Sequence, residues 1–350
     1  MRIAYVNQDP GIGPERKKGA AVHVAALQRA FRALGCEVIA VEAKDDAAVT
    51  RELSRLDDAS ALDLVYERHA LEASGAAQFC IATTTPLFLE VNAPLLDEAR
   101  EHRGVAPSDA AVRAEAQVLG AAAHVFPVSN AVAQYVAQRG VARERMHVTP
   151  NGVDTDTFRP RAERVLALPN DTFVLGFHGR LRAWHNFALL AESFELLLAR
   201  GRRVHLLAIG EGDFSAHLSA TAQEHATHLA WMPHEQLARH VACFDALPLT
   251  YAPESNCYFS PLKLLEAMAC GAVPLVPDLG DLCEVIEHGR AGLVVRAGDA
   301  HALADAVTTL IDQPQLRSRL GSAAIARARA RTWTHVAREI LAHAGGVHVP

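Results

Sequence analysis

Short apolar runs rich in valine, isoleucine and leucine alternate along the chain with longer, alanine-rich amphipathic segments. This alternation is typical of β-α-β units, in which helices connect parallel strands and cover the faces of the sheet. In the first half of the chain it predicts enough strands for one complete doubly wound sheet. The six predicted strands are residues 2–6, 37–41, 62–67, 87–91, 124–127 and 146–148.

The pattern breaks at Pro150-Asn151-Gly152-Val153-Asp154 and stays irregular to Pro169-Asn170. Turn-forming residues dominate this stretch, so it is predicted to link two domains. A second sheet is then expected, and residues 314–343 follow it as a helical segment. Open α/β sheets bind ligands beyond the carboxyl ends of their strands, which places the expected site in a cleft between the two sheets. The predicted strands of the second sheet are residues 172–177, 204–209, 228–231, 246–249, 273–276 and 292–295.

The length and composition of the chain narrow the function classes. Its 350 residues are about twice the usual domain length of roughly 150, which favours two domains. With 34 Lys and Arg against 40 Asp and Glu, the formal charge is −6, so broad nucleic-acid binding is disfavoured. The six cysteines lack the spacing of zinc sites and are interpreted as buried thiols in a reducing compartment. No apolar stretch approaches the roughly 20 residues that span a bilayer. We expect a cytoplasmic protein, with peripheral contact to the inner membrane face left open and the oligomeric state not predicted.

One predicted helix carries both of its end signals in the sequence. Ser260 is a favoured N-cap residue, Pro261 suits the first helical position, and Gly271 suits the C-terminal cap. Backbone N–H groups at such a helix start attract anions, so a diphosphate is the expected ligand. Lys263 places a cation in the first turn, where it opposes the helix dipole and therefore needs a local anion. Glu266, one turn further on, could accept two hydrogen bonds from a ribose diol or belong to a structural network.

Two stretches around and after this helix carry a family pattern: Glu266-Ala267-Met268-Ala269-Cys270-Gly271-Ala272-Val273-Pro274-Leu275-Val276 and Glu284-Val285-Ile286-Glu287-His288-Gly289-Arg290-Ala291-Gly292-Leu293-Val294. They resemble the donor-binding domain of family-4 retaining glycosyltransferases, which have the GT-B fold. The resemblance covers nearly the whole chain, because it also takes in His178-Gly179-Arg180-Leu181, Gly210-Glu211-Gly212, Asn151-Gly152-Val153-Asp154 and Phe158-Arg159-Pro160.

The resemblance implies an α/β architecture of two Rossmann-like domains that face a central cleft. Residues 1–157 would bind the acceptor, residues 158–330 would bind the nucleotide sugar, and residues 331–350 would form a helix that returns to the N-terminal domain. The implied partners are a nucleotide-diphosphate sugar, as co-substrate, and a hydroxyl-bearing acceptor. No cofactor and no metal are implied.

The resemblance also implies roles for individual residues. The family has a Glu-x₇-Glu pair, of which the second glutamate contacts the nucleotide ribose and matches Glu266, whereas Tyr258 stands in the place of the first. Arg180 matches a family arginine that contacts the diphosphate, and His185 stands where the family commonly has a lysine that contacts it too. The implied donor-binding residues are Gly19, Gly210, Trp231, Met232, Tyr258, Ser260, Pro261, Leu262 and Glu266, and the implied catalytic residues are Arg180, His185, Lys263 and Asn92.

Several of these residues also have a purely structural interpretation. Arg180 could be a surface arginine at a strand end, and His185 could be a structural histidine. Gly210 could serve the ordinary geometry of a strand-to-helix turn, and Trp231 could belong to the core. Tyr258 puts the identity of the transferred sugar in doubt, because the family's first glutamate contacts the donor sugar.

Polar residues at two strand ends in the first half are expected to face the cleft. Many family members have a histidine about where Asn92 falls; Asn92 can donate and accept hydrogen bonds but cannot act as a general base. Glu90, Glu67 and Arg68 could bind the acceptor or pair with each other. The acceptor-binding residues implied are His23, Arg68 and Glu90, and the basic run Arg16-Lys17-Lys18 is either acceptor-facing or solvated.

Asp154-Thr155-Asp156 fits the Asp-x-Asp pattern that binds metal in the other main glycosyltransferase fold. Its position in the linker after Asn151-Gly152 favours turn chemistry instead. The sequence therefore predicts no metal site here.

The expected function is that of a retaining glycosyltransferase that moves a hexosyl-type unit to a hydroxyl of a glycan, lipid or natural product. A UDP-sugar is the favoured donor and a GDP-sugar the second. Two alternatives stay open at this point: a GT-B sugar-nucleotide epimerase, and a catalytically silent nucleotide-sugar-binding subunit. Retention is implied by the resemblance alone.

Overall fold

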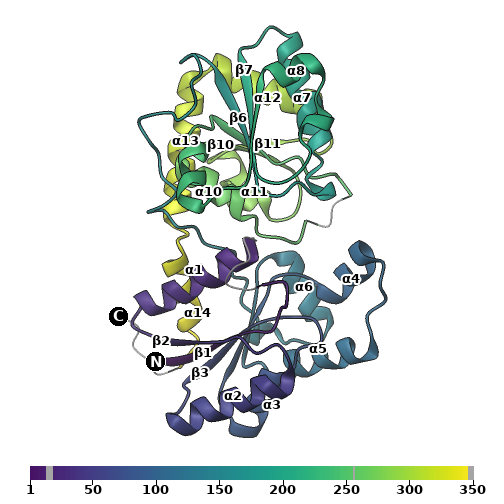
Figure 1. Cartoon of the computed structure of the whole chain (residues 1–350), viewed down its shortest axis with the longest axis vertical. Helices are drawn as coiled ribbons and strands as arrows, with labels where there is room; N and C mark the ends of the chain where they lie inside the picture. The colour runs from purple at the N-terminus through teal and green to yellow at the C-terminus, as the bar shows by residue number, and fades with distance from the viewer. Residues whose placement is uncertain (13–18, 255–256, 346–350) are drawn as a thin grey trace. The chain divides into compact units, whose positions relative to one another are not determined.

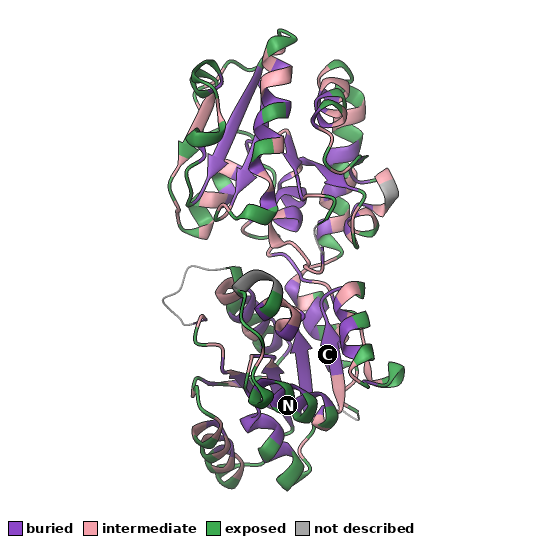
Figure 2. Ribbon diagram, turned by 90° about the vertical axis from the view of Figure 1, so that its right-hand side faces the viewer, coloured by how far each residue is buried: buried purple, intermediate pink, exposed green. Residues whose placement is uncertain are grey.

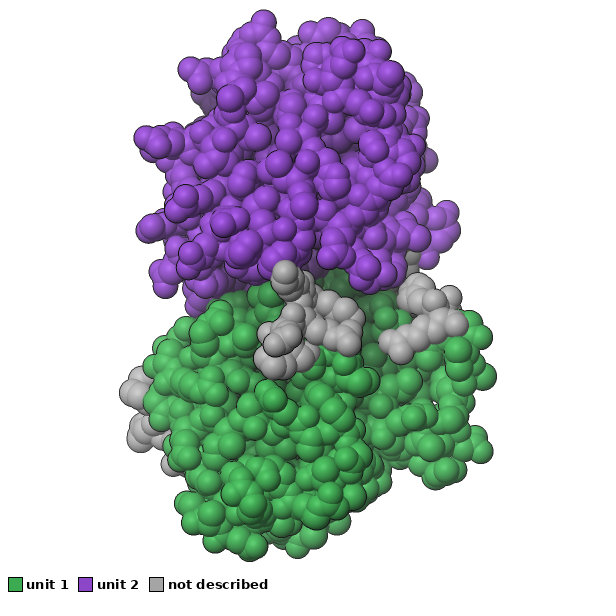
Figure 3. Space-filling model, in the orientation of Figure 1, with its two compact units in different colours: residues 1–151, 258–260, 333–350 green, residues 152–257, 261–332 purple. Residues whose placement is uncertain are grey.

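The computed structural model describes residues 1–12, 19–254 and 257–345 of the 350-residue chain. The chain forms two compact units, each built around one parallel sheet (Figure 1). Unit 1 comprises Met1–Asn151, Tyr258–Ser260 and Trp333–Pro350, and unit 2 comprises Gly152–Cys257 and Pro261–Thr332 (Figure 3). Each unit is therefore assembled from separate stretches of the sequence.

Unit 1 contains a sheet of five strands in the order β2-β1-β3-β4-β5, and all neighbouring pairs are parallel. This order, with a reversal beside β1, is that of a doubly wound α/β sheet. Its elements are β1 (Arg2–Asn7), α1 (Gly19–Ala33), β2 (Glu37–Val41), α2 (Asp46–Ala59), β3 (Leu64–Arg68), α3 (Gly75–Thr83), β4 (Leu87–Val91), α4 (Leu95–Arg103), α5 (Asp109–Ala121), β5 (His124–Pro127), α6 (Asn130–Gln138), the 3₁₀ turn η1 (Arg143–Arg145) and α14 (Trp333–Leu341).

The sixth strand predicted for this half, residues 146–148, is wrong. Met146 forms only an isolated parallel bridge with Val125. The segment donates two backbone hydrogen bonds to β5, from His147 to Val125 and from Thr149 to Pro127. Pro150 follows at once, and because a proline has no N–H it cannot extend the ladder.

Alternate side chains of the unit 1 strands face opposite sides of the sheet. On one face Val65 and Leu89 pack in an apolar core with residues of α2, α3, α5 and α6. On the other face Tyr66 contacts Phe31 of α1, and α1 packs against α14. The strands lie buried between the two layers (Figure 2).

Unit 2 contains a sheet of six parallel strands in the order β11-β10-β9-β6-β7-β8. All six strands predicted for this half are confirmed, with bounds that shift by up to two residues at either end. The elements are β6 (Phe173–His178), η2 (Ala183–His185), α7 (Phe187–Ala199), β7 (Val204–Ile209), η3 (Ser215–His217), α8 (Ala220–Glu224), β8 (Ala226–Leu229), α9 (His234–Val241), β9 (Ala246–Pro248), α10 (Leu262–Cys270), β10 (Val273–Pro277), α11 (Leu282–Val285), η4 (Glu287–Gly289), β11 (Leu293–Val295), α12 (Ala300–Asp312) and α13 (Pro314–Arg329).

Two helix layers cover the unit 2 sheet as well. Helices α7 and α12 pack together over one apolar core, and α10 packs against α9 and α13. The predicted helical segment 314–343 is two helices, α13 and α14, separated at Thr332, which forms an isolated bridge with Val153. Among the helices of the described residues, none is long and apolar enough to cross a membrane.

The carboxyl group of Glu67 lies within the unit 1 core. Glu67 of β3 is 1% exposed, and neither of its carboxylate oxygens has a hydrogen-bond partner among the described residues. Burial raises the pKa of Glu67 to about 8, and the Asp46 carboxylate adds to the shift. Glu67 is therefore protonated in the folded protein at neutral pH, and the sequence-based option that it pairs with Arg68 or Glu90 is wrong.

The stability of unit 1 is expected to fall as pH rises from about 4.5 to 8, because Glu67 then keeps a proton that the unfolded chain has released. Glu67→Gln removes this dependence, so the variant should match wild type near pH 5 and exceed it near pH 8.5. The measurement is urea unfolding followed by fluorescence of Trp333, the only tryptophan left in a Trp184→Phe, Trp231→Phe background. A wild-type excess that persists at pH 8.5 would contradict the assignment.

Candidate functional site

The unit 2 site lies at the carboxyl edge of its sheet, where parallel strands end and their loops begin. Strand β6 ends at His178, and Gly179 then adopts a φ of +112°, a left-handed conformation that favours glycine. The chain runs on through the 3₁₀ turn η2 to His185. Strand β9 ends at the same edge, and its loop leads to helix α10.

The start of α10 differs from its prediction. Pro261, not Ser260, occupies the N-cap position, and the Pro261 side chain makes no capping hydrogen bond. The Ser260 hydroxyl instead accepts a hydrogen bond from the Asn151 N–H at 3.0 Å, and its carbonyl accepts one from Asn151 Nδ2 at 2.7 Å. The helix ends as predicted at Gly271, in a left-handed conformation with a φ of +94°.

Lys263 and His185 meet at this helix start. Lys263 Nζ lies 2.9 Å from His185 Nε2 and 4.5 Å from the centre of the Phe177 ring. His185 is 9% exposed, and Thr250 fixes its backbone by donating a hydrogen bond of 2.7 Å to its carbonyl. The Lys263 amine in the first turn of α10 and the His185 imidazole at the end of η2 are therefore held side by side.

The tautomer of His185 follows from the contact of its other ring nitrogen. The backbone N–H of Arg182 donates to His185 Nδ1 at 3.2 Å, so the neutral ring carries its hydrogen on Nε2, facing Lys263. Burial lowers the pKa of His185 to about 3, with the charges of Lys263 and Arg182 acting in the same direction. Burial also lowers the pKa of Lys263 to about 7, against the Glu266 carboxylate, which raises it. The single N–H of the neutral imidazole and the ammonium group of protonated Lys263 thus share one space, and an anion that accepts from both would satisfy them.

Glu266 lies one turn further along α10 and is 8% exposed. Its Oε2 atom is 3.6 Å from His178 Nδ1, while His178 Nε2 lies 3.3 Å from the carbonyl of Lys263. Burial raises the pKa of Glu266 to about 7, and the Lys263 cation opposes this. Glu266 therefore sits beside Lys263 at the strand-end edge and does not extend into bulk water.

Gly210 supports the loop that borders Lys263. Its φ is +136°, and a Cβ atom there would lie 2.1 Å from the Gly179 carbonyl oxygen. A Cβ at Gly179 would in turn contact Lys263 Nζ at 3.7 Å. Gly210 thus has a structural role, because it allows two strand-end loops to pack closely. A structural role was one of the two interpretations considered for it from the sequence.

Gly210→Ala is expected to destabilise unit 2 by about 1–3 kcal/mol, because the added methyl group must push the Gly179 backbone away. The loss should appear in the urea midpoint read from Trp184 and Trp231. Gly201→Ala is the matched control, since it has a positive φ of 68° and nothing within 4 Å of the added carbon. Equal losses in the two variants would show that backbone conformation, and not the close approach, is responsible.

The other residues implied for the donor site lie in separate environments. Arg180 is exposed, and its Nε atom pairs with Glu211 Oε2 at 3.3 Å. Trp231 and Met232 are half-buried just after β8. Tyr258 packs against the unit 1 core, and its carbonyl accepts a hydrogen bond from Ser129. The position of the family's first glutamate therefore belongs to unit 1 in this chain.

A second polar cluster lies at the carboxyl edge of the unit 1 sheet, around Glu90 of β4. Glu90 is 3% exposed; its Oε2 is 2.9 Å from His23 Nε2 and accepts from the Tyr66 hydroxyl at 2.6 Å. Its Oε1 accepts from Arg68 at 2.7 Å and from Asn92 Nδ2. Burial alone would raise the pKa of Glu90, but His23, Arg68 and Tyr66 together hold it well below its usual range.

This cluster, which we call the Glu90 cluster, brings together four of the residues singled out in the sequence: His23, Arg68, Glu90 and Asn92. His23 is 4% exposed and its ring lies 4.7 Å from that of Trp333 in α14, so it is a core histidine. Arg68 and Asn92 are half-buried and form the part of the cluster nearest to solvent. A cavity of about 10 Å³ adjoins it, about the size of one water.

Two remaining sequence predictions concern loops. The Asp154 carboxylate accepts hydrogen bonds from the N–H groups of Asp156 and Thr157 and from the Thr157 hydroxyl, which confirms turn chemistry for the Asp-x-Asp motif. Gly19 is exposed and opens α1. Gly13 and Arg16-Lys17-Lys18 lie outside the described residues.

Comparison with known proteins agrees with both halves of this description. Residues 172–313 match the family model described as glycosyl transferases group 1. Residues 50–157 match the one described as glycosyltransferase family 4. The chain belongs to the family-4 glycosyltransferases.

The curated relatives of this family-4 chain align with it over only part of their length. It is 31% identical over 231 residues to D-inositol 3-phosphate glycosyltransferase of Pseudarthrobacter chlorophenolicus, an alignment that covers 62% of this chain and 54% of the relative. The chain thus spans about half the length of the first curated relatives that it matches.

Solved structures establish the GT-B fold. HepE of Anabaena in complex with UDP superimposes with a TM-score of 0.74 at 19% identity, covering 99% of this chain and 100% of that one. The same protein in complex with UDP-glucose gives 0.69 at 20% identity, with coverage of 99% and 100%. Sucrose-phosphate synthase of Thermosynechococcus elongatus gives 0.72 at 17% identity, covering 97% and 96%.

Three residues, at the start of α10 or in the Glu90 cluster, were not among the predicted site residues. His178, Tyr66 and Thr250 each lie at or near the end of a buried strand. His178 was quoted only as part of a motif. The sequence signal for His178 is a polar residue that ends an apolar strand and directly precedes a glycine.

Proposed function

We propose that this family-4 chain transfers a glycosyl unit from a nucleotide-diphosphate sugar to a hydroxyl group, with the leaving diphosphate bound at the start of α10. The observation that carries the proposal is the 2.9 Å approach of Lys263 Nζ and His185 Nε2 at a helix start whose N-cap residue, Pro261, makes no side-chain capping hydrogen bond. Diphosphate oxygens accept hydrogen bonds from both groups and from the first N–H groups of the helix. Glu266, one turn away, accepts from the ribose hydroxyls.

The chemical step draws on the same groups. The bond between the sugar and the diphosphate breaks, and negative charge develops on the leaving oxygen, where a preorganised cation and donors lower the barrier. Lys263 and the helix start supply this positive potential, so we propose that no metal ion takes part. The acceptor hydroxyl attacks from the face that the diphosphate leaves and gives its proton to the leaving diphosphate oxygen, so the configuration of the sugar is retained.

Unit 1 is proposed to hold the acceptor at the Glu90 cluster. Glu90 and His23 are buried and hydrogen-bonded within the cluster, so they position the half-buried Arg68 and Asn92 and do not themselves reach solvent. Arg68 and Asn92 are then the groups that contact sugar or acceptor hydroxyls. A UDP-sugar is the proposed donor, and the UDP and UDP-glucose complexes of HepE support the choice.

A thermal-shift panel tests the proposal, with UDP-glucose, UDP-galactose, GDP-mannose and ADP-glucose added in the presence of EDTA. A UDP-sugar is expected to raise the unfolding temperature, since a ligand at 100 times its Kd stabilises the fold by about 2.7 kcal/mol. Consumption of that donor with and without hydroxyl acceptors then separates the activities. Isomerised donor without acceptor would identify an epimerase, and binding without any consumption a silent subunit. A panel with no shift would contradict the proposed site.

A further inference from the structure

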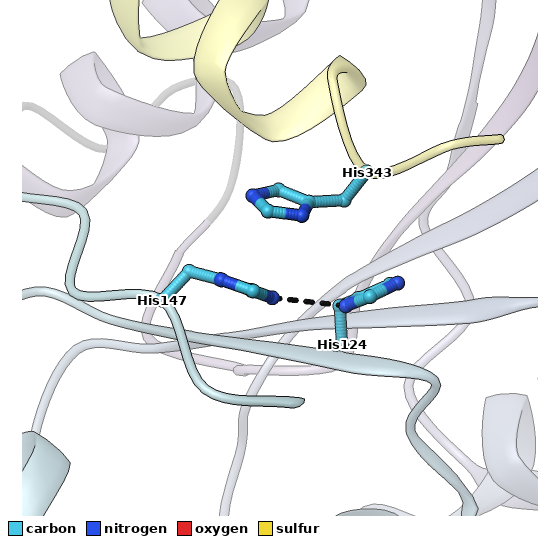
Figure 4. Close-up of side chains that lie close together, drawn as sticks. All are labelled: His124, His147 and His343. Atoms are coloured by element: carbon cyan, nitrogen blue, oxygen red, sulfur yellow. Dashed lines mark hydrogen bonds between the residues drawn. The ribbon is translucent and has the colours of Figure 1, made fainter. Parts of the chain in front are cut away.

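Three histidines gather in unit 1 at the amino edge of its sheet, the edge opposite to the Glu90 cluster. His124 begins β5, His147 follows η1, and His343 follows α14 (Figure 4). The register places His124 beside Phe88, three residues before the proline that ends β5. Segments far apart in the sequence therefore each contribute one imidazole to the same place.

The three rings are close enough to share one ligand. His124 Nδ1 and His147 Nε2 are 2.9 Å apart. The rings of His147 and His343 stack with centroids 3.6 Å apart, so one of these two rings must turn before both can direct a nitrogen at the same ion. One nitrogen from each residue lies within 4.8 Å of the others, and each side chain is half-buried. Among the described residues this is the one group of three or more potential ligand side chains that meets this distance.

Two aromatic rings border the histidine cluster. Phe88 and Phe126 lie beside His124, with ring centroids 5.1 and 6.4 Å away, so one side of the cluster is apolar. Two nitrogens that ligate one zinc ion at about 2.0–2.1 Å with a tetrahedral angle lie about 3.3 Å apart. The facing nitrogens of His124 and His147 need to separate by only a few tenths of an ångström. The one proton between them moves to the other ring nitrogen of the histidine that carries it, which leaves both facing nitrogens free to bind the ion.

We propose that His124, His147 and His343 bind one divalent transition-metal ion, with Zn²⁺ as the reference ion. Three neutral imidazoles are a ligand set that zinc, copper and nickel accept, and water completes the coordination. The Arg145 guanidinium, held by the carbonyls of Leu119, Gly120 and Ala122, approaches His124 from the η1 side. Its positive charge opposes a cation, so the affinity is expected to be moderate.

Bound metal would join three segments of unit 1. His343 lies two residues beyond α14, and this helix packs on α1 and carries Trp333, which contacts His23. A metal bond from His343 to β5 and to the segment after η1 therefore secures the far end of α14. Because the cluster lies at the amino edge of the sheet, the ion stabilises unit 1 and takes no part in the transfer reaction proposed above.

The test uses the full chain, purified without a polyhistidine tag and stripped with EDTA. It is titrated with ZnCl₂ at pH 7.5, above the ordinary imidazole pKa of about 6.5. We expect one zinc per chain by competition with a chromophoric chelator, and a rise in the unfolding temperature on zinc addition. His147→Ala and His343→Ala should each weaken the affinity by at least about 10-fold and abolish that rise.

His301→Ala in α12 is the matched control, because it removes an exposed histidine of unit 2 and should leave binding unchanged. Unfolding of each metal-free variant, followed by Trp333 fluorescence, shows that it is folded before titration. The proposal is overturned if wild type binds no zinc in this range, or if folded His147→Ala and His343→Ala bind zinc as wild type does. If the protein binds zinc but no nucleotide-sugar donor, only the proposed function is contradicted.

Discussion

Lys263→Met is expected to lower the turnover number for sugar transfer by about 10²–10³-fold, the loss seen when one preorganised donor to a developing oxyanion is removed. Methionine keeps most of the length of the side chain and its contact with Phe177, but it removes the cation that faces His185. The stability of the variant should stay near that of wild type. The folded protein gains little from the buried Lys263 charge, because burial disfavours the charged form and lowers the pKa of Lys263 to about 7. Steady-state rates of nucleotide release with a saturating donor measure the effect.

Arg203→Met is the matched control for this prediction. It removes the same charge from unit 2 at the opposite edge of the sheet, where Arg203 precedes β7 and forms an exposed pair with Asp171. Its turnover should remain within about 2-fold of wild type, since an exposed ion pair contributes little. If both variants fall equally, overall charge and not the α10 site explains the loss.

Glu90→Gln is expected to destabilise unit 1 by about 3 kcal/mol at pH 7. The substitution keeps the shape of the side chain but leaves Arg68 and His23 without their buried carboxylate. Trp333 fluorescence in the Trp184→Phe, Trp231→Phe background reports this loss, because Trp333 contacts His23 directly. Glu52→Gln is the control, since Glu52 pairs with Arg55 at the surface and should change little.

The same variant has a defined pH dependence. The pKa of Glu90 is held well below its usual range, so the carboxylate stabilises the fold above the unfolded pKa of about 4.5 and loses this contribution as pH falls further. The difference between wild type and Glu90→Gln should therefore be full at pH 6–7 and shrink below pH 4. A difference that grows toward acid would contradict a charged Glu90.

Much of the architecture followed from the sequence because burial leaves a direct pattern. The strands at residues 37–41, 87–91 and 204–209 have the predicted bounds, since each is a valine- or leucine-rich run with a polar residue directly beside at least one of its ends. Residues 146–148 failed because a run of three residues cannot show whether a partner strand continues beside it. The fold class was confirmed, as both sheets and the GT-B neighbours show.

The site was harder to predict because its contacts join distant positions. Ser260 has the chemistry of an N-cap, but Asn151, 109 residues away, takes its hydroxyl. Lys263 was placed correctly in the first turn of α10, yet its meeting with His185, 78 residues away, depends on the folded strand-end loops. The three-histidine cluster has no local spacing, because positions 124, 147 and 343 are brought together by β5, the segment after η1 and the end of α14.

The most direct measurement is a calorimetric titration of UDP into wild type, Lys263→Met and Arg203→Met in EDTA at pH 6.5. A lost hydrogen bond between charged groups costs about 1.5–3 kcal/mol, so Lys263→Met should bind UDP about 10–100-fold more weakly while Arg203→Met binds as wild type does. Equal affinity in wild type and Lys263→Met would show that the start of α10 does not hold the diphosphate.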